Sequence, residues 1–249
     1  MKIGFTSTTF RQVKELARVA EIGVNGRADC IEWGGDIHVK NADDAKQAKK
    51  ICDDVGLPVS SFGSYYRAGK GDSESRAELC SRVSLLGAES IRIWLGDKGS
   101  QKTDENEYKA LLADTAALCD EAAKYGLTVM PECHPNTFND NTDAFLRFVK
   151  ELDRENFSTY FQSLYRDWDY DLDRIKRTYP YVGKVHISYS ELVRMQAFRK
   201  SDREFIKRIL DAFLSLGYDK TVLLEYTYFA SEKHFYKDMD RLREDLGIK

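Results

Sequence analysis

The stretch from Ala48 to Phe62, AKKICDDVGLPVSSF, decides the fold of this chain. An amphipathic run ends at Gly56, and a short apolar run begins directly after it. Glycine is favoured just beyond the last turn of a helix, because the backbone there is left-handed and penalises a Cβ. A short, nearly continuous apolar run is typical of a strand covered on both faces. The stretch therefore predicts a helix followed closely by a buried strand.

The same unit recurs along the chain without a repeated sequence. It is found again in RVSLLGAESIRIWL (82–95), CDEAAKYGLTVMPE (119–132) and DAFLSLGYDKTVLLEY (211–226). The corresponding glycines are Gly87, Gly126 and Gly217. Helices that alternate with buried strands imply parallel pairing through right-handed crossovers.

Laid end to end, these units predict a single α/β domain. The predicted strands are 2–6, 29–33, 58–63, 90–95, 128–132, 158–162, 183–187 and 221–226. The predicted helices are 11–22, 42–55, 73–86, 104–125, 140–153, 170–178, 201–216 and 231–245. Eight units over residues 1–249 favour one closed (β/α)₈ TIM barrel. A doubly wound sheet is the alternative, but TSTTFRQ after the first strand lacks a glycine-rich dinucleotide fingerprint.

Composition excludes several classes of partner. The net charge is −3, which provides no field to attract nucleic acid or an anionic membrane. No apolar run is long enough for a signal peptide or a membrane span. The five cysteines are scattered without metal-site spacing and are interpreted as reduced, mostly buried thiols. We therefore expect a cytoplasmic protein, and a homo-oligomer is compatible with the sequence.

Acidic and imidazole side chains follow several predicted strands. Active sites of such barrels lie at the carboxyl ends of the strands. Glu132, His186 and Glu225 lie at the ends of strands five, seven and eight. A glutamate in an apolar strand has to be paired, hydrogen-bonded or bound to a metal, and this ligand set suits a divalent cation. Glu32, at the end of strand two, is either a site residue or the partner of Arg92 or Lys184 in a salt bridge.

Further side chains near strand ends are candidates for substrate contact. His134 lies two residues beyond Glu132, on the same face, and either contacts substrate or packs. Arg67, after strand three, could receive a phosphate or carboxylate or lie on the surface. Aromatic side chains that could line a sugar pocket, or simply pack, include Trp33, Trp94 and Tyr165.

Six short motifs, taken together and in order, carry a resemblance that covers essentially the whole chain. They are IEWGGD (31–36), IRIWLGD (91–97), PECHPN (131–136), FQSLY (161–165), KVHIS (184–188) and LLEY (223–226). The set resembles the xylose isomerase-like TIM-barrel superfamily. That group contains sugar and sugar-phosphate isomerases, ketose 3-epimerases, inosose dehydratases and the endonuclease IV fold.

The resemblance implies a set of metal ligands. In the epimerase-like members, one divalent ion is held by glutamate, aspartate, histidine and glutamate on strands five to eight. The matching residues here are Glu132, Gln162, His186 and Glu225. Gln162 departs from the pattern, as does Tyr165, where relatives have a histidine three residues after the aspartate. An amide oxygen can bind a hard cation but adds no charge, so the expected outcomes are weaker binding or loss of the metal.

The resemblance also implies the chemistry. Glu132 and Glu225 would act as acid and base on a sugar or sugar phosphate in carbohydrate metabolism, through an enediolate beside the metal. Manganese, magnesium or cobalt is expected before zinc, because the ligand set has no thiolate. The alternatives are a lyase resembling inosose dehydratase and a degenerate barrel that binds a sugar without turnover. Four histidines and a net negative charge argue against a multi-zinc nuclease.

Overall fold

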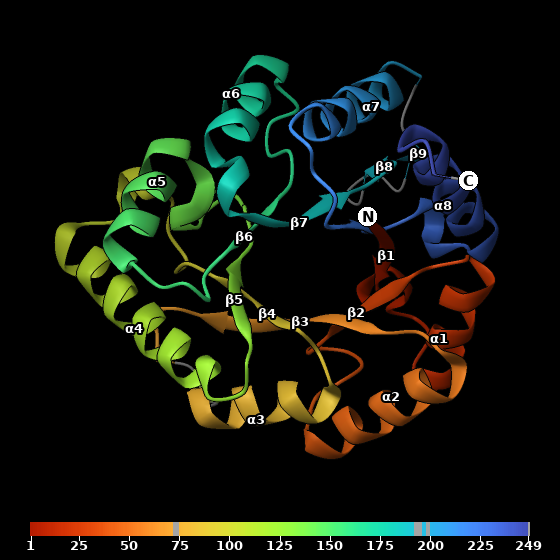
Figure 1. Cartoon of the computed structure of the whole chain (residues 1–249), viewed down its shortest axis with the longest axis horizontal. Helices are drawn as coiled ribbons and strands as arrows, with labels where there is room; N and C mark the ends of the chain where they lie inside the picture. Colours follow the sequence, from red (N-terminus) through yellow and green to blue (C-terminus); the bar gives the residue numbers. More distant parts are fainter. Residues whose placement is uncertain (72–74, 192–195, 198–199, 249) are drawn as a thin grey trace.

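A ring of parallel strands surrounded by helices forms the molecule (Figure 1). The computed structural model describes residues 1–71, 75–191, 196–197 and 200–248. Within these residues, the eight-stranded sheet has the order β5-β4-β3-β2-β1-β10-β7-β6. The two ends of the sheet meet at a parallel bridge between Val129 and Phe157. There, Val129 N donates to Asn156 O at 2.9 Å, and Ser158 N donates to Val129 O at 3.0 Å. The predicted closed barrel is confirmed.

Seven of the barrel strands lie close to the predicted ranges, and β3 extends further. The eight barrel strands are β1 (Lys2–Thr6), β2 (Cys30–Gly34), β3 (Val59–Arg67), β4 (Ser90–Trp94), β5 (Thr128–Pro131), β6 (Thr159–Phe161), β7 (Val182–Ile187) and β10 (Thr221–Leu224). The sequence did not predict the two-residue strands β8 (Ser190–Glu191) and β9 (Gln196–Ala197), which pair antiparallel after β7.

The helices follow the strands in the predicted order. They are α1 (Leu16–Asn25), α2 (Ala42–Val55), α3 (Arg76–Leu86), α4 (Glu105–Ala123), α5 (Thr142–Leu152), α6 (Trp168–Thr178), α7 (Lys200–Ser215) and α8 (Glu232–Asp245). Residues 73 and 74 of the predicted third helix lie outside the described residues. Gly56 and Gly87 end α2 and α3 with φ of 68° and 73°, the left-handed conformation that the sequence predicts.

The first helix is the main correction. It was predicted over 11–22, but the chain forms a 3₁₀ turn at Ser7–Phe10 and begins α1 only at Leu16. The intervening loop contacts residues that follow β2. Arg11 pairs with Asp36, and the Val13 carbonyl accepts a hydrogen bond from His38 Nε2 at 2.8 Å.

Side chains alternate between the inside of the barrel and the layer beneath the helices. On β2, Glu32 points inward and reaches Tyr160 of β6, whereas Trp33 packs in the main hydrophobic core outside the barrel. On β4, Arg92 points inward between two buried outward-facing isoleucines, Ile91 and Ile93. The inside of the barrel is therefore polar near its carboxyl end.

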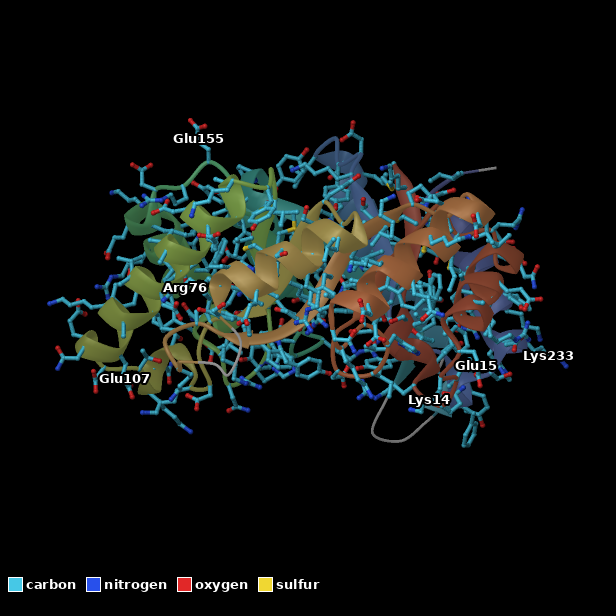
Figure 2. All side chains as sticks on the ribbon, turned by 90° about the horizontal axis from the view of Figure 1, so that it is seen from below. Lys14, Glu15, Arg76, Glu107, Glu155 and Lys233 are labelled. Carbon is cyan, nitrogen blue, oxygen red and sulfur yellow. The ribbon has the colours of Figure 1, made fainter. Side chains whose placement is uncertain are left out.

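Figure 2 shows the barrel from the side and separates its two ends. Lys14, Glu15 and Glu107, near the starts of helices, lie at one edge, and Glu155, in the loop before β6, lies at the other. The first edge is the barrel mouth, where strands end. All five cysteines are free and buried, as predicted. No helix in the described part of the chain combines the length and apolar character needed to cross a membrane.

Candidate metal centre

Glu132, His186 and Glu225 converge at the mouth of the barrel. Glu132 directly follows β5, His186 lies in β7, and Glu225 directly follows β10. Backbone hydrogen bonds fix both glutamates, from Glu132 N to Ile93 O at 2.9 Å and from Glu225 N to Ile187 O at 2.8 Å. One ligand atom from each of the three side chains lies within 4.8 Å of the others. This agrees with the separation expected for ligands of one cation.

The ring of His186 is oriented with one nitrogen toward the cluster. Its Nδ1 lies 3.7 Å from Glu132 Oε1 and 3.6 Å from Glu225 Oε2. Its Nε2 faces Glu32 Oε1 at 3.8 Å, on the opposite side. Neither nitrogen has a hydrogen-bond partner, although the ring is buried. Buried polar atoms are rarely left unsatisfied, so Nδ1 is suited to bind a cation between the two glutamates.

Glu32 lies deeper in the barrel, in a network of its own. Its carboxylate contacts Arg92 Nε at 3.1 Å and accepts hydrogen bonds from Ser61 at 2.8 Å and Tyr160 at 2.6 Å. A contact between Glu32 and substrate stays a prediction, and the salt bridge of the alternative interpretation is present. Its partner is Arg92. The other suggested partner, Lys184, donates to Ser60 O at 3.1 Å and Ser90 Oγ at 2.7 Å.

Arg92 links the deep network to the cluster at the mouth. It pairs with Glu32 on one side and with Glu132 Oε2 on the other. The Trp94 indole donates to the same oxygen of Glu132 at 2.7 Å. Arg92 and Trp94 lie two residues apart on β4, so both point inward.

Opposing effects set the pKa values of the cluster in the metal-free protein. Burial raises the pKa of Glu132, but Arg92 and His186 outweigh it and lower this pKa to about 2. Burial lowers the pKa of His186, but Glu225, Glu132 and Glu32 outweigh it and raise this pKa to about 10. Burial raises the pKa of Glu225, with Glu132 adding to it and His186 opposing it.

The residues present fit a divalent cation. The cluster offers two carboxylates and one imidazole whose nitrogen has no other partner. With neutral His186, the charges of Glu32, Glu132, Glu225 and Arg92 sum to −2, which a divalent ion would balance. Oxygen and imidazole ligands without thiolate suit manganese, magnesium, cobalt or zinc.

The remaining predicted site residues are placed as follows. Gln162 is the first residue beyond β6, two positions after the inward-facing Tyr160, and is partly exposed. Alternation therefore favours an inward side chain, and its role as fourth ligand stays a prediction. Tyr165 is 57% exposed and packs on Tyr170, with ring centroids 5.3 Å apart. Its contact with substrate also stays a prediction.

Trp94, His134 and Arg67 lie together at the rim. The ring centroids of His134 and Trp94 are 5.7 Å apart, and Arg67 Cζ lies 4.2 Å from the centroid of the Trp94 ring. His134 Nδ1 donates to the Pro135 carbonyl at 2.8 Å. Substrate contact by these three residues stays a prediction.

Trp33 is not brought to the site. Its ring is fully buried, 5.6 Å from the His38 ring and beside the thiol of Cys52 on α2. The period of two along a strand explains this, because Glu32 takes the inward position and its neighbour must face the helices. A substrate contact by Trp33 is therefore incompatible with the structure.

Two residues of the site region were missed from the sequence. Tyr160 anchors Glu32 from across the barrel, and its inward position could have been found by counting two residues back from Gln162. Tyr226, directly after Glu225, has a positive φ of 60° and its N–H donates to Thr9 Oγ1 at 3.0 Å. No local pattern predicts such a conformation for tyrosine.

The fold and the site together define a TIM barrel with an acidic and imidazole cluster at its mouth. The family model described as "Xylose isomerase-like TIM barrel" matches residues 16–245, and the chain belongs to this family.

Individual relatives are distant in sequence. The chain is 21% identical over 198 residues to a 3-dehydroshikimate dehydratase of Bacillus anthracis, covering 75% of this chain and 71% of the relative. A solved structure of a probable 3-DHS dehydratase from Bacillus anthracis superposes with a TM-score of 0.77 at 17% identity, covering 97% and 98% of the two chains. D-psicose 3-epimerase with D-tagatose, from Clostridium cellulolyticum H10, superposes with a TM-score of 0.75 at 14% identity, covering 99% of each chain. These structures share the fold.

Proposed function

We propose that this protein is a metal-dependent enzyme that moves a proton at the carbon next to a carbonyl in a sugar, sugar phosphate or related polyhydroxy compound. The observation that carries the proposal is the convergence of Glu132, His186 and Glu225 at the barrel mouth, with His186 Nδ1 unpartnered between the two carboxylates. The cation would be manganese, magnesium or cobalt before zinc, and Gln162 its fourth protein ligand.

The chain supplies both binding and proton transfer in this proposal. When bound, the cation would polarise the substrate carbonyl. A carboxylate at the centre takes the proton from the adjacent carbon, which leaves an enediolate. Delivery of a proton to the opposite face of the same carbon, by the second glutamate, gives epimerisation, and delivery to the former carbonyl carbon gives isomerisation. In this proposal the rest of the substrate is held by three side chains that pack together at the rim, Trp94, His134 and Arg67.

A dehydratase is the second candidate, because a 3-dehydroshikimate dehydratase is among the relatives. It would use the same first step. The carbon–oxygen bond of a hydroxyl next to the enediolate would then break, and the hydroxyl would leave as water with a returned proton. The barrel would differ from an epimerase only in the fate of the intermediate.

Solvent deuterium incorporation tests the proposal. The protein would be loaded with Mn²⁺ and incubated in deuterated water with ketoses such as D-fructose and D-tagatose, ketose phosphates and 3-dehydroshikimate. We expect deuterium next to the carbonyl of an accepted compound by NMR, and loss of the exchange after chelation with recovery on adding Mn²⁺. The product identifies the reaction as epimerisation, isomerisation or dehydration.

Two results would contradict the proposal. Conversion that continues unchanged after exhaustive chelation would remove the metal from the reaction. Tight binding of one of these compounds without any exchange would favour a barrel that binds sugars without turnover.

A further inference from the structure

The two glutamates of the candidate metal centre are held in different ways. One oxygen of Glu132, Oε2, accepts from both Arg92 and the Trp94 indole, and the other, Oε1, faces His186 Nδ1. Glu225 differs, because among the described residues no hydrogen-bond donor contacts its carboxylate. His186 Nδ1 lies 3.6 Å from its Oε2, and the side chain of Glu225 is 14% exposed, against 3% for Glu132.

The donors that hold Glu132 are themselves fixed. Arg92 is 4% exposed, and its Nε contacts Glu32 at 3.1 Å, so it is anchored on both sides by carboxylates. The Trp94 ring is flanked by Tyr65, with centroids 5.1 Å apart, and by Arg67 and His134. Rotation of the Glu132 carboxylate would break two charge-assisted hydrogen bonds in a buried site, where such bonds are strongest.

We infer that Arg92 and Trp94 are positioning residues that orient Glu132 so that its Oε1 is presented to the cation, whereas no such donor orients the carboxylate of Glu225. This inference rests on the proposed function. Because Oε2 accepts from both donors, Oε1 is the oxygen of Glu132 that faces His186 Nδ1 and would bind the cation. The carboxylate of Glu225 is free of such donors and reaches solvent.

A glutamine at position 132 or 225 distinguishes a side chain that is oriented by donors from one that is not. Arg92 and the Trp94 indole can only donate hydrogen bonds. In the Glu132→Gln variant, both donors therefore bind the amide oxygen, and the NH₂ group faces the cation. An NH₂ group cannot bind a cation. In the Glu225→Gln variant, no described donor competes for the amide oxygen, and it can still face the cation.

Titration of Mn²⁺ into metal-free protein measures this difference without any activity assay. We expect the Glu132→Gln variant to bind Mn²⁺ at least about 100-fold more weakly than wild type, because it loses a ligand. The Glu225→Gln variant keeps an oxygen ligand and should lose roughly tenfold, through the lost charge. Thermal melting of both metal-free variants checks that the fold is retained.

A change at Trp94 tests in a second way whether Arg92 and Trp94 orient Glu132. Trp94→Phe keeps an aromatic ring but removes the donor to Glu132, and loss of such a partner should weaken Mn²⁺ binding by about 10-fold. In the Glu132→Gln background, the same change removes one of the two donors that hold the amide oxygen, so Mn²⁺ affinity should rise by about threefold or more. Trp168→Phe, at the start of α6, makes the same chemical change at a ring that packs against the Arg208 guanidinium, 3.9 Å from its centroid, and should leave affinity unchanged.

The outcomes separate this inference from the proposed function. Equal loss of Mn²⁺ affinity in the two glutamine variants would overturn the inference that Arg92 and Trp94 orient Glu132. A Trp94→Phe effect of the same sign in both backgrounds would do the same. Either result leaves the metal centre itself in place. Wild-type protein that binds no Mn²⁺ would overturn the proposed metal centre and the inference with it.

Discussion

The Glu225→Gln variant is expected to lower turnover of any accepted substrate by at least about 10²-fold, the usual contribution of a positioned acid or base. The change keeps the shape of the side chain and an oxygen that can face the cation, but removes the proton acceptor. The effect should therefore fall on kcat and on solvent exchange, while the Mn²⁺-loaded variant still binds substrate.

Steady-state kinetics and deuterium incorporation, both at saturating Mn²⁺, measure this effect. Glu155→Gln is the matched control, because Glu155 is exposed at the opposite end of the barrel (Figure 2) and should leave both rates unchanged. If the Glu225→Gln variant retains wild-type exchange, Glu225 does not carry the proton.

The Arg92→Met variant is expected to show the largest loss of stability. Arg92 is buried between Glu32 and Glu132, and removing it leaves two buried carboxylates without their cationic partner. Breaking a buried ion pair on one side costs about 3–5 kcal/mol, because an uncompensated charge remains in a low-dielectric interior. Chemical denaturation of the metal-free protein measures this free energy of unfolding.

Arg154→Met provides the control for the Arg92 variant. Arg154 pairs with Asp120 at 2.7 Å on the surface, where solvent screens the interaction. Its loss should leave the free energy of unfolding nearly unchanged. Similar stability of the two methionine variants would show that the buried network does not hold the barrel interior together.

Local patterns were sufficient to predict the barrel and the three residues of the cluster. Gly56 and Gly87 end helices where their conformational freedom requires them, and the apolar runs that follow form strands. Since parallel strands of a closed barrel end at the same rim, the strand positions of Glu132, His186 and Glu225 were enough to predict their convergence.

Contacts across the barrel could not be predicted from the sequence. Arg92 and Trp94 precede Glu132 by 40 and 38 residues, and only the three-dimensional register places both donors on one of its oxygens. Trp33 shows a different limit. Its place near a strand end made it a candidate to line a sugar pocket, although strand alternation puts its side chain on the face opposite to Glu32.

The position of a bound cation tests the proposed centre most directly. Crystals of the protein with Mn²⁺ would locate the ion by its anomalous scattering, and calorimetry would give its stoichiometry. We predict one ion per chain, bound by Glu132 Oε1, His186 Nδ1 and a Glu225 oxygen. Because the pKa of metal-free His186 is raised to about 10, binding at pH 7 should release its proton, and affinity should rise with pH below that value. An ion bound elsewhere, or none bound at millimolar Mn²⁺, would contradict the proposal that this cluster is a metal centre.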